Sequence, residues 1–483
     1  MNLSDFQAHD AQLHEALQLQ RSAYHAEPNP SRASRMEDLR QLRRLITENT
    51  DALCDAICAD YGHRSRHETL LTEVMPAISS IDHALAHLKR WMRVQRRPVD
   101  RLTFGLASNR VVPQPLGVVG VIVPWNFPLN LSLVPLSAIL AAGNRAMVKM
   151  SENSRHLAAC LMALAPRYLP HDKLRFFDET GGVGVAFSRL KFDHLLFTGS
   201  GQTGRAVMAA AAQNLCPVTL ELGGKSPAFI AEDFDLRTAV ERVMYVKCLN
   251  GGQICTTVDV VYVPRARVDE FVALAREVVQ QRFPAPSAQT PPLFSPDFTA
   301  IINPAAYQRL LAALEEARAG GATVVPLLEG PQHDEANHKL APQLVLNAPA
   351  NCALMQREIF GPVLPVLPYD SVDEVIADIN SRPRPLAFYP FSHNEALLQR
   401  LLDHVMSGGV SINDGLFHVA QHDLPFGGVG DSGMGHYHGE EGFQTFSKLR
   451  PVFRQSRWLS TASLLYPPYG PRIERLLTFL LKR

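Results

Sequence analysis

The sequence predicts an α/β protein built on parallel sheets, in two or three substantial domains. Its 483 residues exceed what one hydrophobic core supports. From residue 118 onward, short strands alternate with helices, as in βαβ units. These strands are apolar at nearly every position, which is typical of a parallel sheet covered on both faces.

The first hundred residues are expected to be helical. Charged and apolar residues recur with a helical period in Met36–Cys58 and Ala77–Arg97, and no strand signal interrupts them. A polar, proline-containing stretch, Arg96–Asn109, follows. The valine-rich Val111–Val123 then predicts strands.

Two runs of alternating elements come next. The first run ends at Pro217–Leu220, where the rhythm breaks. Its expected elements are the strand Val118–Val123, the helix Leu131–Ala142, the strand Ala146–Met150, the helix Ser154–Leu164, the strands Leu174–Asp178 and His194–Thr198, and the helix Gly204–Gln213. The second run has strands at Pro227–Ile230, Val260–Val263, Ala322–Val325 and Gly361–Tyr369, with a surface loop at Pro284–Pro296 and closing segments at Gly408–Ile412 and Leu424–Gly435.

Composition excludes several classes of protein. Basic and acidic residues balance at 47 each, so no bulk field attracts nucleic acid or an anionic membrane. Seven scattered cysteines do not form a disulfide framework, none has zinc spacing, and we expect no metal site. The polar N-terminus lacks a signal peptide, and no apolar run is long enough to span a membrane. A reducing, cytoplasmic location is expected.

Two short segments carry the strongest chemical signal. Thr219–Lys225 holds Glu221 beside two glycines, and Asn250–Thr256 holds Cys255 in a glycine-rich turn. A cysteine nucleophile that forms an acyl intermediate needs a base to discharge it, and Glu221 could be that base. Free cysteine is most often a small core residue. The glycines before Cys255 argue against that, because glycine packs nothing unless the backbone must turn sharply, and a neighbouring helix N-terminus would favour the thiolate.

The segment Gly199–Gly204 formally matches the dinucleotide pattern GxGxxG, after a strand and before a helix. The match is weak, because this fingerprint usually opens a βαβ series and here it comes late. A glycine turn without ligand is one alternative, and a nucleotide phosphate at the helix N-terminus is the better-supported one. The pattern also assigns Glu221 to a ribose, which conflicts with its role beside Cys255.

Two strand ends carry polar groups where ligands bind in α/β proteins. Asn126 lies between two prolines in Pro124–Pro128, and its amide could donate to a developing oxyanion or cap the next helix. Lys149 and Glu152 follow the next strand, where they could bind ribose hydroxyls or form a solvated turn.

Taken together, these segments resemble the aldehyde dehydrogenase superfamily. The matching motifs run in order along most of the chain: Pro124–Pro128, Lys149–Glu152, Phe197–Gly204, Glu221–Lys225, Asn250–Thr256, Glu358–Pro362 and Pro425–Gly428. Leu386–Tyr389, Gly430–Gly439 and Tyr466–Tyr469 resemble the class 3 branch, and Asn413–Gly435 is most similar to bacterial coniferyl aldehyde dehydrogenases.

The resemblance implies a role for each motif. Cys255 would be the nucleophile, Glu221 the general base and Asn126 an oxyanion donor, while Lys149 and Glu152 would hold the adenosine ribose. This resolves the conflict at Glu221. The remaining cofactor-binding residues implied are Pro124, Trp125, Ser151, Gly199, Ser200, Gly204, Leu222, Glu358 and Phe360. Glu358 would hold the nicotinamide ribose. Ile254 and Thr256–Thr257 depart from other class 3 members, which leaves the substrate class open.

The resemblance also implies the domain layout and assembly. Residues 1–100 and 116–221 would form a Rossmann-type cofactor domain, and residues 222–409 a second α/β domain, the catalytic one. Residues 101–115 and 410–450 would form a small β arm for a homodimer, followed by a tail, 451–483. We expect the helix at Arg472–Arg483 to pack near the pocket mouth; it is too short to span a membrane.

The expected activity is oxidation of an aromatic, coniferaldehyde-like aldehyde to the carboxylic acid with NAD or NADP through a thiohemiacetal and a thioester. Glu152 favours NAD, because an acid repels a 2′-phosphate. Alternatives are transfer of the acyl group to coenzyme A, a long-chain aliphatic substrate, and a silent binding protein on the same fold. A cysteine hydrolase is also conceivable, but the nearest histidine, His194, lies in an apparent strand.

Overall fold

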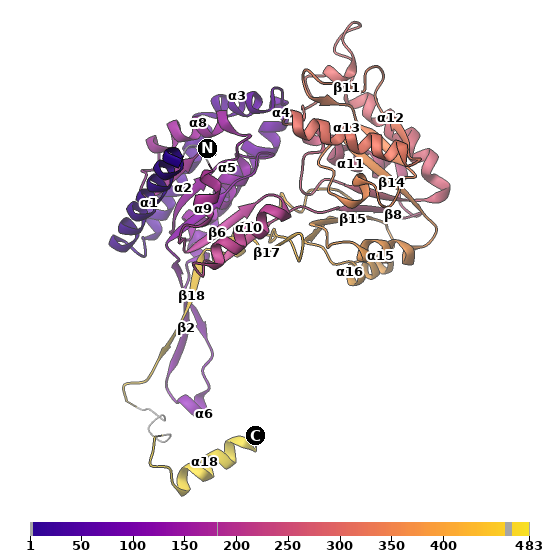
Figure 1. Ribbon diagram of the computed structural model, residues 1–483. Helices are drawn as coiled ribbons and strands as arrows, with labels where there is room; N and C mark the ends of the chain where they lie inside the picture. Colours follow the sequence, from indigo (N-terminus) through magenta and orange to yellow (C-terminus); the bar gives the residue numbers. More distant parts are fainter. Residues whose placement is uncertain (1–2, 181, 459–465, 483) are drawn as a thin grey trace.

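The structure is a computed structural model that describes residues 3–180, 182–458 and 466–482. Two α/β bodies lie side by side, and a β ribbon projects from the first (Figure 1). The first sheet has the strand order β17-β7-β6-β3-β4-β5 and is parallel except for β17. Its strands are β3 Val118–Ile122, β4 Arg145–Lys149, β5 Leu174–Phe177, β6 His194–Thr198, β7 Val218–Glu221 and β17 Gly433–Met434.

Helices cover both faces of this sheet, as its apolar strands predict. Along β3, Val119 and Val121 belong to one core cluster, whereas Val118 and Ile122 belong to another on the opposite face. Helices α2, α3, α5, α7 and α8 build the first cluster, and α1, α9 and α10 build the second. The helices are α1 Leu3–Ala26, α2 Arg32–Thr47, α3 Thr50–Tyr61, α4 Arg66–Thr69, α5 Met75–Trp91, α7 Asn130–Ala141, α8 Arg155–Leu164, α9 Val183–Ser188 and α10 Gly201–Ala212.

The second sheet has the order β10-β13-β14-β9-β8-β15-β16 and is parallel except for β10. Its strands are β8 Pro227–Ile230, β9 Val260–Pro264, β10 Thr323–Pro326, β13 Gln343–Leu346, β14 Val363–Tyr369, β15 Ala387–Phe391 and β16 Gly409–Val410. The accompanying helices are α11 Leu236–Cys248, α12 Val268–Arg282, α13 Pro304–Ala319, α14 Ala353–Gln356, α15 Val372–Ser381 and α16 Glu395–His404. A short hairpin joins β11 His333–Asp334 to β12 Lys339–Leu340.

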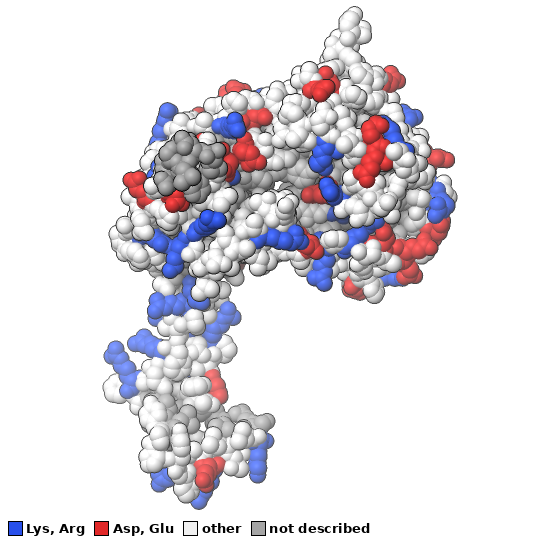
Figure 2. All heavy atoms as spheres, in the orientation of Figure 1, with Lys and Arg blue, Asp and Glu red and all other residues white. Residues whose placement is uncertain are grey.

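The projecting ribbon is a third, antiparallel sheet of β1 Gln95–Arg97, β2 Ser108–Pro115 and β18 Ser447–Arg454. The short helices α6 Arg101–Phe104 and α17 Gly439–Thr445 precede β2 and β18. Basic side chains gather along the ribbon, while the two bodies show both signs of charge interspersed (Figure 2). The division of the chain into domains at the predicted boundaries stays a prediction.

Three sequence expectations are wrong. The first hundred residues do contain a strand, β1, whereas Met36–Cys58 is helical as expected and is divided between α2 and α3. The rhythm does not break at Pro217, because β7 continues the same sheet beside β6. The C-terminal helix α18, Pro471–Leu481, does not contribute to the lining of the large cavity, and it exposes Phe479 to solvent. Part of the predicted tail, residues 459–465, lies outside the described residues.

Among the described helices, none is both long enough and apolar enough to cross a bilayer. Over the same residues, no cluster of three or more histidine, cysteine, aspartate or glutamate side chains could hold a metal ion.

Candidate active site

The turn that carries Cys255 forms because three successive residues adopt left-handed backbone conformations. Asn250, Gly251 and Gly252 have φ values of 53°, 59° and 73°. A Cβ atom on Gly252 would collide with the carbonyl oxygen of Gly361, so glycine is required there. The predicted sharp turn is therefore present. This segment, residues 249–256 and called the cysteine loop below, places Cys255 half-buried in the wall of a large cavity.

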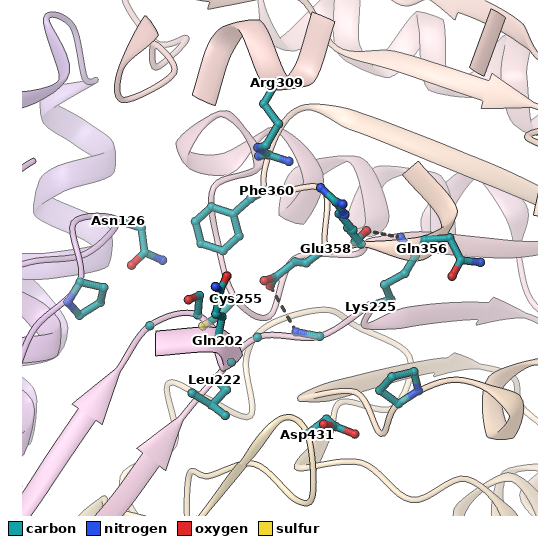
Figure 3. A pocket seen from close by; sticks show the side chains of 18 of the residues that line it. Asn126, Gln202, Leu222, Lys225, Cys255, Arg309, Gln356, Glu358, Phe360 and Asp431 are labelled. Carbon is teal, nitrogen blue, oxygen red and sulfur yellow. Dashed lines mark hydrogen bonds between the residues drawn. The ribbon is translucent and has the colours of Figure 1, made fainter. Parts of the chain in front are cut away.

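That cavity has a volume of about 1150 Å³ and is lined by residues of both bodies. It brings Cys255, Glu221 and Asn126 together on its wall, although they are far apart in sequence. Cys255 and Asn126 are labelled in Figure 3. Of the predicted cofactor residues it is lined by Pro124, Trp125, Gly199, Ser200, Leu222, Glu358 and Phe360. The lining does not include Lys149, Ser151, Glu152 or Gly204.

The Cys255 thiol is protonated at neutral pH in this site. Burial raises its pKa to about 12, and the charges of Glu358 and Glu221 raise it further, against the backbone N–H groups of Cys255 and Thr256. No α-helix begins within the cysteine loop, which runs from the short turn η3 (Leu249–Gly252) toward β9, and stabilisation of the thiolate by a neighbouring helix N-terminus stays a prediction. Attack by Cys255 therefore requires transfer of its proton to a base.

Glu221 ends β7 and is almost fully buried, with 2% of its surface exposed. Within the described part of the chain, neither carboxyl oxygen has a hydrogen-bond partner. Burial without a partner raises the pKa of Glu221 well above its usual range, so the neutral acid is favoured. Tyr437 is also buried here, and the charges of Glu221 and Cys255 help burial raise its pKa. The sequence motif that contains Tyr437 suggested no role for it.

Asn126 is held by its backbone and by its side chain. Its carbonyl oxygen accepts hydrogen bonds from the Tyr61 hydroxyl at 2.9 Å, Asn250 Nδ2 at 3.1 Å and Arg64 Nη1 at 3.3 Å. Its own Nδ2 donates to the carbonyl oxygen of Gln253, in the cysteine loop, at 3.2 Å. The amide of Asn126 is thus fixed beside the cysteine loop, with one further N–H available for donation.

An ion pair without solvent exposure lies behind Asn126. Arg64 Nη1 donates to Glu73 Oε1 at 2.6 Å, and both side chains have an exposed fraction of 0%. Glu73 Oε2 accepts from the backbone N–H groups of Leu129 and Asn130 at 2.7 and 3.0 Å, at the start of α7. Sequence reasoning missed this pair, because charged residues in the helical N-terminal region look like solvated ones.

We expect Glu73→Gln to lower the apparent melting temperature by about 6–20 °C. The substitution leaves the Arg64 charge buried without its partner, and breaking such a pair costs about 3–5 kcal/mol. Thermal melting of the purified protein measures the change. The matched control is Asp82→Asn, which breaks the exposed Arg43–Asp82 pair. Loss of such a pair costs about 1 kcal/mol or less. Equal melting shifts in the two variants would contradict the importance of the buried pair.

The cofactor side of the cavity is built from α10 and the segment that contains Glu358. Ser200 Oγ accepts from the N–H of Thr203 and caps α10, whose first turn faces the cavity. Free N–H groups of a helix N-terminus bind phosphate. Glu358 accepts from the N–H of Gly224 at 3.3 Å, and burial raises its pKa to about 8. A Cβ atom on Gly223 would collide with the Glu358 carboxylate, so glycine keeps this space open. The residues present fit a dinucleotide.

The residues predicted to bind the ribose lie at the carboxyl end of β4. Lys149 forms an ion pair with Glu179, and Ser151 Oγ donates to Glu152 Oε2 at 3.2 Å. Gly204 packs against Leu222, where a Cβ atom would lie 2.8 Å from Leu222 Cδ2. Their assignment to a cofactor stays a prediction. Glu179 had no sequence signal.

An apolar cluster contains residues that neighbour Asn126 and Cys255 in the sequence. It contains Phe127, Leu249 and Ile254, with Leu131 and Leu416 packed against it. Each of the first three is adjacent in sequence to the catalytic candidates or to the glycine turn, but only Ile254 was noted from the sequence. His194 lies elsewhere, with Nε2 hydrogen-bonded to Thr219 Oγ1 at 2.9 Å, and burial lowers its pKa to about 4. His194 therefore does not serve Cys255 as a base.

Comparisons with known proteins agree with this geometry. A model described as the aldehyde dehydrogenase family matches residues 4–452. A probable coniferyl aldehyde dehydrogenase of Pseudomonas aeruginosa is 50% identical over 465 residues, which are 96% of this chain and 95% of that protein. A coniferyl aldehyde dehydrogenase of a Pseudomonas species is 40% identical over 473 residues, 97% of this chain and 96% of that one.

Solved structures are similar over nearly the whole chain. A substrate-bound Staphylococcus aureus AldH has a TM-score of 0.90 at 31% identity and covers 99% of this chain and 100% of its own. A Mycobacterium tuberculosis aldehyde dehydrogenase complexed with NAD+ has a TM-score of 0.81 at 26% identity, covering 92% and 90%. An NADP-dependent enzyme of E. coli has a TM-score of 0.83 at 25% identity, covering 92% and 91%.

Proposed function

The chain belongs to the aldehyde dehydrogenase family, and from that premise we propose that it oxidises an aromatic, coniferaldehyde-like aldehyde to the carboxylic acid with NAD+. As a member of the family it is an enzyme that oxidises aldehydes with NAD(P)+. The observation that carries the proposal is the meeting of Cys255, Glu221 and Asn126 on the wall of one cavity that also contains Glu358.

The first half of the reaction acylates Cys255. The thiol releases its proton to water in the cavity, and the sulfur attacks the carbonyl carbon. The carbonyl oxygen becomes an oxyanion that accepts hydrogen bonds from the Asn126 amide and the Cys255 backbone N–H. Glu358 and the first turn of α10 would hold NAD(P)+, which when bound would supply the acceptor for the hydride of that carbon. Collapse of the oxyanion restores the C=O bond and leaves a thioester on Cys255.

The second half of the reaction hydrolyses the thioester. Glu221 takes a proton from a water molecule, whose oxygen attacks the thioester carbonyl. Asn126 again donates to the oxyanion. The C–S bond then breaks, the carboxylic acid leaves, and Cys255 regains a proton. No metal takes part in these steps.

Support for an aromatic substrate comes from the apolar cluster and from the relatives. Phe127, Leu249 and Ile254, which flank Asn126, the glycine turn and Cys255 in the sequence, form a buried apolar cluster, and apolar surroundings suit a planar ring better than a charged group. The relatives at 50% and 40% identity are named for coniferyl aldehyde. An exposed Glu152 near a ribose supports NAD+ over NADP+, because it repels a 2′-phosphate.

The assembly and location belong to the same proposal. We infer a homodimer that forms through the projecting ribbon, where Phe104, Leu106 and Phe453 expose apolar surface. All seven cysteines are free thiols, which suits a reducing compartment such as the cytoplasm. The domain boundaries inferred from the resemblance complete this proposal.

We expect the purified protein to reduce NAD+ when given coniferaldehyde, without added metal or coenzyme A. A panel of aromatic and aliphatic aldehydes with NAD+ and NADP+, followed by absorbance at 340 nm, tests this. The highest kcat/KM is expected for aromatic aldehydes with NAD+. No absorbance rise with any aldehyde would overturn the activity. A preference for long-chain aliphatic aldehydes would overturn only the substrate class, and a requirement for coenzyme A would overturn hydrolysis.

A further inference from the structure

A largely buried ion pair lies at the carboxyl ends of β4 and β5 in the first sheet, beside the residues predicted to bind the ribose. Lys149, at the carboxyl end of β4, pairs with Glu179, which follows β5, and their side chains have exposed fractions of 8% and 18%. The Glu179 oxygens also accept from the N–H of Gly184 at 2.9 and 3.2 Å. Glu179 is therefore held in place from two sides.

Gly184 is fitted to this pair. A Cβ atom there would lie 2.6 Å from Glu179 Oε2 and 3.2 Å from Lys149 Nζ, so a larger residue would displace one of the two charges. The Lys149–Glu179 pair is thus packed against the Gly184 backbone and has no room for a larger residue there.

We propose that Glu179 is a specificity residue that disfavours NADP+ relative to NAD+. This rests on the proposed function, in which Lys149 and Glu152 face the adenosine ribose. In that arrangement Lys149 is the cation that faces the 2′-position of the ribose, and Glu179 neutralises it. With Glu152 as the second carboxylate, the three side chains carry a net charge of about −1.

The two dinucleotides meet this charge differently. A phosphate monoester carries about −1.5 to −2 charges at pH 7, so the net negative edge repels the 2′-phosphate of NADP+. The 2′-hydroxyl of NAD+ is neutral and can donate to a carboxylate oxygen and accept from the Lys149 ammonium. Glu152 is exposed and screened by solvent, whereas Glu179 is mostly buried, so its charge acts at a lower effective dielectric.

The test measures dissociation constants of NAD+ and NADP+ by isothermal titration calorimetry, without aldehyde. In Glu179→Gln we expect the Kd of NADP+ to fall about tenfold and that of NAD+ to change by less than about threefold. Glu179→Ser, a second neutral variant, is expected to behave in the same way. Glu179→Asp keeps the charge and should keep the preference of the unaltered protein. The difference between the Gln and unaltered proteins for NADP+ should shrink at high salt.

The matched control is Asp172→Asn, which removes the carboxylate that pairs with Arg145 at the opposite end of β4. It should leave the ratio of the two dissociation constants unchanged. Thermal melting identifies variants that fold. An unchanged ratio in both folded neutral variants, or an equal loss of both dinucleotides, would overturn the role of Glu179. Failure of the unaltered protein to bind either dinucleotide would instead overturn the proposed function.

Discussion

Cys255→Ser is expected to lower aldehyde-dependent NADH formation by at least about 10³-fold while nucleotide binding persists. A serine hydroxyl is far less acidic than a thiol, and within this site even the thiol has its pKa raised to about 12. Serine therefore cannot supply a usable nucleophile here. Absorbance at 340 nm measures the rate, and calorimetric titration with NAD+ measures binding, which should stay within about threefold of the unaltered protein.

The control for this experiment is Cys160→Ser on α8. Cys160 is half-buried, as Cys255 is, but it does not line the cavity. Replacement of Cys160 by serine should leave the rate of NADH formation within about twofold of that of the unaltered protein. Substantial activity in Cys255→Ser, or equal losses in the two serine variants, would remove the covalent step from the proposal.

The sequence predicted the parts of the fold that follow local patterns. The alternation of apolar strands and helices gave both parallel sheets, and the glycine turn before Cys255 has the sharp backbone that was expected. The strand β7 was missed because Pro217 looked like a break. Pro217 lies just before the strand, where its carbonyl oxygen accepts a hydrogen bond from the N–H of Leu195. A backbone N–H is not required at this position, so proline is tolerated there. β1 was missed because its three residues are polar or charged.

The candidate site divides in the same way. Asn126, Glu221 and Cys255 each lie in a short motif, so their chemical roles could be predicted from the local sequence. In the structure all three line one cavity. Contacts between distant segments could not be read. The hydrogen bond from the Arg64 guanidinium to the carbonyl oxygen of Asn126 spans 62 positions along the chain, and no local pattern encodes it. The burial that raises the pKa of Glu221 is likewise a property of the packed molecule.

Glu221→Gln is expected to trap the thioester. Glutamine keeps the shape of the side chain but cannot take a proton from water, so deacylation should slow by about 10²–10⁴-fold. A burst of about one NADH per active site should precede the slow phase, because each acylation releases one NADH. Rapid mixing with absorbance at 340 nm measures the burst, and intact-protein mass spectrometry detects the acyl group on the enzyme.

The control is Glu241→Gln on α11, a half-buried carboxylate outside the cavity lining. It should show no burst beyond that of the unaltered protein. Unchanged steady-state turnover in Glu221→Gln would contradict the assignment of the base and would favour coenzyme A as the acyl acceptor.

The pH dependence follows from the raised pKa of Glu221. Burial favours the neutral acid in the folded protein, so the carboxylate that activates water is present only above a pKa well above the usual range. Turnover limited by deacylation should therefore rise as pH rises through that pKa. In Glu221→Gln this increase of turnover with pH should be absent. The sign for stability is opposite. Because the folded protein favours the proton more than the unfolded chain does, ionisation of Glu221 costs stability, and that stability is lost as pH rises through the folded pKa. The carboxylate form of Glu221 that activates water is therefore also the form that destabilises the folded protein. The packing that excludes water from Glu221 thus affects both catalysis and stability.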